Sequence, residues 1–324
     1  MKKIYLLILL IVFANFSLTA QKTQEQYDKT VIKGLEKVKN GFNFLVVGDW
    51  GRNGHYNQQQ VADRMDETAH HLGIEFIISV GDNFYSNGVA SVEDPMWQTS
   101  FEQVYHGANL FENWYAILGN HDYRGNPQAQ IDYSKKSRRW NMPSHYYSFE
   151  RELDDNSGKK ILFVFIDTNP LEKKYYTDET YMFTDVVKQD TAKQLAWLNQ
   201  TLAQSDAHWK IVVGHHPIYT TGKRKNEPPY VRYSLQPIFE KYKVDMYFSG
   251  HEHDLQHQKH QDFVTHQFVS GAGSEVREVK EPSAYTKFAK AEHGFMAVSA
   301  TSKEVLVQII NDKGEVIYKT LVKK

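Results

Sequence analysis

The sequence predicts a layered α/β fold in which helices flank two central mixed sheets. Short apolar runs alternate with stretches of helical periodicity through most of the 324 residues, and strand patterns dominate after residue 263. The chain has no stretch rich in Pro, Gly and Ser that would separate two domains. We therefore expect one domain over residues 41–324.

The expected elements follow in chain order. Apolar runs predict strands at residues 42–47, 76–80, 114–118, 161–166, 209–213 and 246–248. Apolar residues at helical spacing predict helices over residues 56–72 and 186–203. Several further strands are expected between residues 263 and 322, with a hairpin turn at Asn311-Asp312-Lys313-Gly314.

The first twenty residues have the pattern of a secretory signal. Lys2 and Lys3 precede a nearly continuous apolar run, and small residues end at a cleavage site after Ala20. A membrane anchor is the alternative, but the apolar run is shorter than a bilayer requires. We expect residues 1–20 to be a signal peptide, residues 21–40 a polar lead-in, and the protein periplasmic or secreted without a stable membrane anchor.

Composition limits the function classes. Hydrophobic residues make up 41% of the chain, which is enough for a sizeable core. The formal net charge of −1 argues against a broad nucleic-acid-binding surface, and the absence of Cys excludes thiolate ligands and a Cys nucleophile. The basic run at residues 135–139 is interpreted as a solvated loop, with steering of anionic substrates as the alternative.

Five short clusters of polar residues each follow an expected strand. In open α/β sheets, ligands collect at the carboxyl ends of strands, so we expect these clusters to meet. Their carboxylate, phenol, amide and imidazole groups suit hard or borderline cations such as Fe, Mn and Zn. The clusters are Gly48-Asp49-Trp50-Gly51, Gly81-Asp82-Asn83-Phe84-Tyr85, Gly119-Asn120-His121-Asp122, Val213-Gly214-His215-His216 and Gly250-His251-Glu252-His253.

These clusters resemble the calcineurin-like metallophosphoesterases, and most closely the small, tartrate-resistant type of purple acid phosphatase. Tyr85, at the end of the second cluster, distinguishes the purple acid phosphatases from most other metallophosphoesterases, which lack a Tyr ligand at this position. The alternative for Tyr85 is a packed aromatic residue at the pocket rim. His216 is expected to pack or to hydrogen-bond beside the site. The resemblance extends from residue 44 to the carboxyl terminus and implies the α/β-β-α sandwich of that family.

The resemblance implies a dinuclear site. Asp49, Tyr85 and His253 would bind Fe(III), and Asp82 would bridge to a second metal. An anionic phenolate favours the ferric state, whereas neutral ligands suit a divalent ion. The second metal, Fe, Zn or Mn, would be held by Asn120, His215 and His251.

The resemblance also implies the reaction, which is hydrolysis of small phosphorylated substrates by in-line attack of a metal-bound hydroxide. His121 would bind phosphate or protonate the leaving alkoxide, and Asp122 would orient His121. A further His of the mammalian-type enzymes is replaced by Arg224, which can bind phosphate but is a poor proton donor. Tyr123 likewise stands where those enzymes have a His.

The expected function is thus a metal-dependent phosphomonoesterase of the acid phosphatase type. A phosphodiesterase, a nucleotidase or a pyrophosphatase on the same two-metal core is the first alternative. A non-catalytic binding protein on an inactive phosphoesterase scaffold is a weaker alternative, because all seven ligands and His121 are present. The physiological substrate, the second metal and the oligomeric state stay open.

Overall fold

The computed structural model describes residues 21–182 and 184–324, so the expected signal peptide lies outside the described residues. The chain divides into two compact units, Met1–Thr30 and Val31–Lys324. The described part of the first unit contains helix α2 (Gln24–Asp28), which begins with a capping box between Thr23 and Gln26. A search of the described residues for helices found none with the length and apolar character needed to span a bilayer.

The second unit begins at Val31, ten positions before the boundary expected from the sequence. Ile32 is buried in a hydrophobic cluster, and Lys33 pairs with Glu315 through a parallel β-bridge. The backbone of Glu36 also exchanges two hydrogen bonds with the Gln308 side chain, and Leu35 packs against the same cluster. The lead-in of residues 21–40 is therefore only partly a surface segment.

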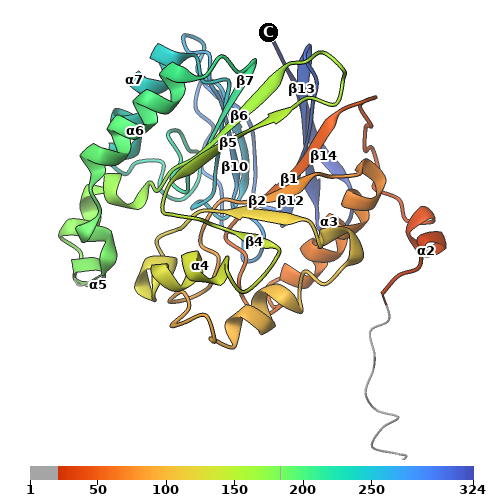
Figure 1. Ribbon diagram of the computed structural model, residues 1–324, viewed down its shortest axis with the longest axis horizontal. Coiled ribbons are helices and arrows are strands. Elements are labelled where there is room, and N and C mark those ends of the chain that lie inside the picture. The colour runs from red at the N-terminus through yellow and green to blue at the C-terminus, as the bar shows by residue number, and fades with distance from the viewer. Residues whose placement is uncertain (1–20, 183) are drawn as a thin grey trace, which may run out of the picture. The chain divides into compact units, whose positions relative to one another are not determined.

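Two seven-stranded sheets form the centre of the second unit. The first has the strand order β14-β13-β12-β1-β2-β3-β4, and the second has the order β11-β9-β10-β8-β7-β6-β5 (Figure 1). The bounds are β1 (Phe42–Val47), β2 (Phe76–Ser79), β3 (Asn113–Ala116), β4 (Trp140–Asn141), β5 (Tyr147–Glu152), β6 (Lys160–Phe165), β7 (Trp209–Val213), β8 (Met246–Ser249), β9 (Leu255–Gln258), β10 (His266–Ser270), β11 (Thr286–Lys290), β12 (Gly294–Ala300), β13 (Glu304–Asn311) and β14 (Val316–Lys323).

Both sheets are mixed, as predicted. Strands β1, β2 and β3 run parallel in the first sheet, and β6, β7 and β8 run parallel in the second. The later strands β12, β13 and β14 pair in antiparallel fashion beside β1, with residues 311–314 turning between the last two. The structure confirms the hairpin and the six strands predicted before residue 250. Each observed strand end lies within two residues of the predicted one.

Helices flank the sheets on opposite sides. Helices α3 (Gln58–Leu72) and α4 (Pro127–Tyr133) accompany the first sheet, and α6 (Thr191–Gln204) and α7 (Tyr230–Tyr242) accompany the second (Figure 1). Helix α3 begins two residues later than expected because Tyr56 and Asn57 have positive φ angles. Helix α6 begins at Thr191 instead of residue 186, because the Asp190 side chain caps it by accepting from the Lys193 amide.

The largest apolar side chains between the sheets come from both of them. Phe44 and Phe76 of the first sheet contact Phe163 of the second, with ring centroids 5.4 and 5.2 Å apart in edge-to-face geometry. Edge-to-face pairs of this kind add about 0.5–1.5 kcal/mol beyond the burial of their area. Separate clusters lie under α3 and under α6 and α7. The predicted fold, two mixed sheets between helical layers, is confirmed.

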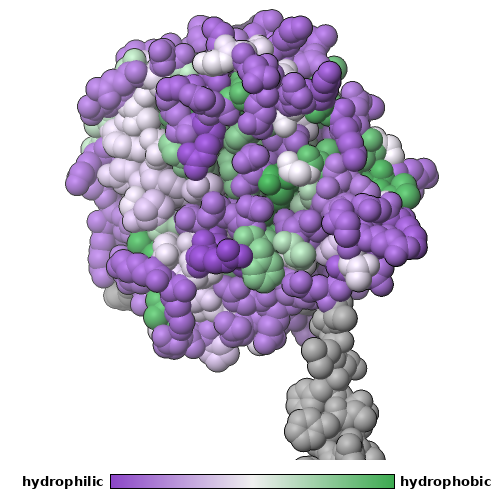
Figure 2. Space-filling model, turned by 45° about the vertical axis from the view of Figure 1, so that its right-hand side comes forward, coloured by the Kyte–Doolittle hydropathy of each residue, from purple (hydrophilic) through white to green (hydrophobic). Residues whose placement is uncertain are grey.

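The surface carries few large apolar side chains. On the face drawn in Figure 2, hydrophilic residues predominate, and hydrophobic ones form small separate patches. Tyr56 and Tyr233 are among the exposed large residues. Small isolated patches of this kind are ordinary for a globular surface.

Candidate metal centre

The five polar clusters meet where the parallel strands of the two sheets end. Clusters one to three follow β1, β2 and β3, and clusters four and five follow β7 and β8. Three of the expected ligands, Asp49, Asp82 and His251, have φ angles of 57°, 50° and 69°. Such left-handed conformations are unusual for residues with a side chain and are concentrated at functional sites.

Close backbone approach explains the glycines that precede these ligands. Gly81 has a φ of 90°. A Cβ added at Gly119 would lie 2.1 Å from the Asp82 amide nitrogen and 2.2 Å from its carboxylate. No other residue type fits at position 119, so the second and third clusters can touch only because this position is Gly.

The first group of ligands surrounds the Tyr85 hydroxyl. Its oxygen lies 2.9 Å from Asp49 Oδ1, 2.9 Å from Asp82 Oδ2 and 3.0 Å from His253 Nε2. All four side chains are buried. A phenol has one proton to donate, so it satisfies only one of the two carboxylates. This crowding of buried oxygen and nitrogen lone pairs is the arrangement that a cation would stabilise.

The second group of ligands surrounds His215. Its Nδ1 lies 2.9 Å from the Val80 carbonyl oxygen, which can only accept, so Nδ1 carries the proton and Nε2 has a free lone pair. That Nε2 lies 3.2 Å from His251 Nδ1 and 3.5 Å from Asp82 Oδ1. The carbonyl oxygen of the Asn120 side chain is buried without a hydrogen-bond partner.

These observations fit two metal ions. The buried groups Asp49, Asp82 and His253 offer ligand atoms within 4.8 Å of one another, and so do His215 and His251 in a neighbouring set. The two carboxylate oxygens of Asp82 face different sets, since Oδ2 lies beside Tyr85 and Oδ1 beside His215. Asp82 therefore lies between one group formed by Asp49, Tyr85 and His253 and another that contains His215 and His251.

The electrostatics of the two carboxylates also require positive charge. Burial and the nearby Asp82 carboxylate raise the pKa of Asp49 well above its usual value. Burial also acts to raise the pKa of Asp82, but His215 and His121 outweigh it and lower that pKa to about 2. Burial and both carboxylates raise the pKa of Tyr85. A bound cation favours the anionic form of all three groups, which opposes the shifts at Asp49 and Tyr85 and agrees with the shift at Asp82.

His121 lies at the mouth of this site. Its Nε2 is 4.0 Å from Asp82 Oδ2, and its ring packs against Tyr85 with centroids 4.5 Å apart. Its Nδ1 lies 2.6 Å from the Ser86 carbonyl oxygen, so Nδ1 donates and Nε2 faces the metal ligands. Its side chain is 17% exposed, in contrast to the buried ligands, and can therefore reach a substrate.

The expected contact between Asp122 and His121 is wrong. The Asp122 carboxylate is fully buried and accepts hydrogen bonds from the backbone amides of Asn83, Phe84 and Gly119. These amides belong to the second and third clusters. Asp122 therefore fastens two ligand-bearing loops together, while the Ser86 carbonyl orients His121.

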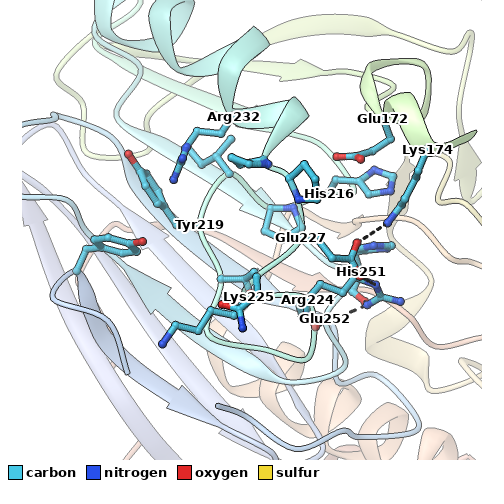
Figure 3. A pocket seen from close by; sticks show the side chains of 17 residues that line it. Glu172, Lys174, His216, Tyr219, Arg224, Lys225, Glu227, Arg232, His251 and Glu252 are labelled. Atoms are coloured by element: carbon cyan, nitrogen blue, oxygen red, sulfur yellow. Dashed lines mark hydrogen bonds and ion pairs between the residues drawn. The ribbon is translucent and has the colours of Figure 1, made fainter. Parts of the chain in front are cut away.

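Arg224 lies beside the second group of ligands. It lines a cavity of about 210 Å³ together with His216 and His251 (Figure 3). Its guanidinium donates to the His251 carbonyl oxygen at 2.8 Å and lies 3.6 Å from Glu252 Oε2. The side chain is 21% exposed, so part of it stays accessible from the cavity.

His216 is close enough to His215 and His251 to look like a ligand. Both of its ring nitrogens are already used, since Nδ1 lies 2.8 Å from Thr168 Oγ1 and Nε2 lies 2.7 Å from the Tyr175 hydroxyl. The expectation that His216 hydrogen-bonds beside the site is confirmed.

Sequence reasoning missed Tyr181. Its hydroxyl accepts a hydrogen bond from Asn120 Nδ2 at 2.8 Å and another from Arg124 Nε at 3.2 Å. By holding the amide nitrogen, Tyr181 directs the amide oxygen of Asn120 to the ligand side. Tyr181 belongs to helix α5 (Glu179–Met182), in a segment without any recognisable motif, so the sequence carried no signal for this role.

Comparisons with known proteins agree with this geometry. A family model described as calcineurin-like phosphoesterase matches residues 42–255. Purple acid phosphatase 3 of Arabidopsis thaliana is 35% identical over 326 aligned positions, which cover 97% of this chain and 84% of that protein. Tartrate-resistant acid phosphatase type 5 of Homo sapiens is 33% identical over 295 positions, covering 86% of this chain and 89% of that protein.

Solved structures are similar as well. GAP50, described as the anchor in the inner membrane complex of Plasmodium, has a TM-score of 0.76 at 25% identity and covers 88% of this chain and 89% of its own. A purple acid phosphatase from yellow lupin seeds has a TM-score of 0.65 at 16% identity, over 87% of this chain and 54% of that one, which shows the fold alone. From the family model and the full-length relatives together, the chain belongs to the calcineurin-like phosphoesterases and, within them, to the purple acid phosphatases.

Proposed function

We propose that the protein is a metal-dependent phosphomonoesterase of the acid phosphatase type, acting on small phosphorylated substrates. The observation that carries this proposal is the position of Asp82, whose two carboxylate oxygens face Tyr85 on one side and His215 on the other. A carboxylate in this position can bridge two cations about 3.5–4 Å apart, the spacing of two-metal phosphatases.

The two halves of the site differ in charge, and this difference supports a ferric ion beside a divalent one. Asp49 and Tyr85 offer a carboxylate and a phenolate to one position, whereas Asn120, His215 and His251 offer only neutral atoms to the other. The divalent ion would be Fe, Zn or Mn. When bound, such a pair supplies Lewis-acid activation of water and neutralises the charge of the phosphoryl group.

The residues of the chain then have distinct tasks. His121 faces the site through Nε2. Because Nδ1 already carries the proton of the neutral ring, Nε2 would bind the phosphoryl group or give a proton to the departing oxygen in the imidazolium form, in which both ring nitrogens are protonated. Water adds to phosphorus, the bond from phosphorus to the alcohol oxygen breaks, and the alcohol leaves with a proton. Asp122 and Tyr181 hold the loops and the Asn120 amide in place during these steps.

The experiment that tests this proposal starts with a visible absorption spectrum of purified, air-oxidised protein. A broad charge-transfer band that gives a purple colour would identify ferric iron bound by the Tyr85 phenolate. A colourless protein at full iron occupancy would refute that assignment. Turnover of a panel of phosphomonoesters, phosphodiesters, nucleotides and pyrophosphate would then identify the reaction class.

A non-catalytic role on the same scaffold is the second candidate, because the structural neighbour GAP50 is described as an anchor. The complete set of buried ligands in this chain favours catalysis. If fully metal-loaded protein hydrolysed nothing on the panel, the non-catalytic candidate would replace the first.

We also propose that the protein is exported to the periplasm or secreted, on the basis of the pattern in residues 1–20. Mass spectrometry of the protein from the exported fraction would show an amino terminus at Gln21. An intact Met1 in the cytosolic fraction would contradict this proposal.

A further inference from the structure

Two cavities that share lining residues lead away from His251, and we call them together the groove. The first cavity is lined by His251 and Arg224 and also by Tyr219, Arg232 and Tyr285. In Figure 3, Tyr219 and Arg232 lie on the opposite side of this cavity from His251. A second cavity, of about 590 Å³, shares Tyr219, Arg232 and Tyr285 with the first and continues along helix α7. The two cavities therefore adjoin at these three residues, between His251 and helix α7.

The far end of this groove, defined by Tyr219, Arg232, His260, Phe263 and Tyr285, is aromatic. The ring of Tyr219 lies 4.7 Å from that of Tyr285 and 5.9 Å from that of His260, between centroids. The ring of His260 in turn lies 4.6 Å from that of Phe263. These residues come from the segment after β7, the loop between β9 and β10 and the segment before β11, so the cluster is a product of the fold.

The same end carries a cation without an ion-pair partner among the described residues. The Arg232 guanidinium lies over the Tyr219 ring at 5.2 Å. Glu240 is the carboxylate that lines the same cavity, and it forms no ion pair with Arg232. An aromatic surface beside a guanidinium plane is the combination that binds a nucleobase by stacking.

The end near the metal ligands is different, because its cations already have partners. Lys174 pairs with Glu227 at 2.8 Å, and Arg224 lies 3.6 Å from Glu252. Lys225, which also lines this cavity, donates to the Glu281 carbonyl oxygen at 2.6 Å, so the protein already engages each of these three cations. The groove therefore suits a leaving group with a neutral middle and an aromatic end.

We propose that this groove binds the leaving group of a nucleoside monophosphate, with the base against Tyr219, Tyr285 and Arg232 and the sugar beside Arg224. This inference rests on the proposed phosphomonoesterase function and specifies its substrate class. In a simple aryl phosphate the ring is bonded directly to the phosphoryl oxygen. Its ring would lie beside His251 and would not reach Tyr219 at the other end of the cavity.

The test compares AMP with ribose 5-phosphate, which has the same sugar and phosphate but no base. We expect kcat/KM for AMP to exceed that for ribose 5-phosphate by about tenfold, the usual effect of stacking one base. Arg232→Ala and Tyr285→Ala should bring this ratio close to one. Lys241→Ala is the matched control, since it removes one exposed positive charge from the same helix outside the groove and should preserve the ratio.

A second measurement does not depend on activity. Saturation-transfer NMR with adenosine and the metal-free protein should show contact between the base and the protein, and Arg232→Ala should weaken it. An equal kcat/KM for AMP and ribose 5-phosphate, together with no adenosine binding, would overturn the inference. Arg232-dependent turnover of phosphotyrosine but not of AMP would also overturn it.

Failure of the proposed function is distinguishable from failure of this inference. If the metal-loaded protein hydrolyses ribose 5-phosphate but does not favour AMP, only the nucleotide subsite is wrong. If it hydrolyses neither compound, the phosphomonoesterase proposal is wrong, and adenosine binding still decides whether the groove holds a nucleoside.

Discussion

Replacing Tyr181 by Phe tests whether a residue outside the five sequence clusters orients a metal ligand. The substitution removes the hydroxyl that accepts from Asn120 Nδ2 at 2.8 Å and from Arg124 Nε at 3.2 Å. It keeps the ring, which packs 4.3 Å from Tyr175 between centroids. The change in packing is therefore small, and the loss of the hydrogen bonds dominates.

The magnitude follows from what Asn120 loses. Its buried amide nitrogen would be left without an acceptor, which costs about 1–3 kcal/mol. Rotation of the amide relieves this cost but turns the NH₂ group, which cannot bind a cation, to the metal side. Either outcome should weaken binding of the second metal by about 10–100-fold, as removal of a residue that orients a ligand does in other metal sites.

The assay is calorimetric titration of Zn²⁺ into protein that holds one equivalent of iron, with the visible spectrum as a measure of the first site. Tyr176→Phe is the matched control, because its hydroxyl contacts only the Pro170 carbonyl oxygen among the hydrogen bonds described and its residue is 41% exposed. An affinity for zinc that stays within about twofold of the wild-type value would refute the orienting role of Tyr181. An equal loss in Tyr176→Phe would attribute the effect to local folding.

Three further outcomes are expected. Tyr85→Phe should abolish the visible charge-transfer band while iron stays measurable by metal analysis; a retained band would require another phenolate. His251→Ala should lower the occupancy of the second metal and turnover together, and unchanged turnover would remove His251 from the ligand set. The pKa of His257 is lowered to about 3 by burial and by its neighbour His266, so the unfolded state binds the extra proton below the ordinary value of 6.5. The free energy of unfolding should therefore fall as the pH falls from 6.5 toward 3, by about 1.4 kcal/mol per pH unit; in urea unfolding of chelated protein, His257→Gln should show a shallower fall, and equal slopes would contradict the assignment.

The strands, and the clusters of polar residues that follow them, were predictable because they depend on local patterns. Five of the six apolar runs predicted before residue 250 are followed by a cluster of expected ligands, and burial of β1 along its whole length agrees with the largely apolar run at residues 42–47. Element ends were less predictable. The start of α6 depends on the Asp190 cap, and the start of α3 depends on the backbone angles of Tyr56 and Asn57.

Residues with a charge or a polar group were harder to assign than strands. The basic run at residues 135–139 was interpreted as solvated, but Arg139 is buried, pairs with Glu102 at 2.6 Å and donates to the Tyr105 carbonyl oxygen. Its partners lie more than thirty positions away in the chain. For the same reason the role of Asp122 was misjudged, since the backbone amides that donate to its carboxylate lie in loops that follow two different strands.

By itself, the sequence determined which kinds of ligand follow each strand and that sulfur takes no part, because these properties belong to short segments. The tertiary structure decided which ligands share a position, that Asp82 lies between the two groups, that Tyr181 holds the Asn120 amide and that Arg232 joins an aromatic groove. These relations depend on strand order, which sets β1, β2 and β3 in one sheet and β7 and β8 in the other. Strand order results from packing between segments far apart in the chain, and no local pattern of apolar and polar residues encodes it.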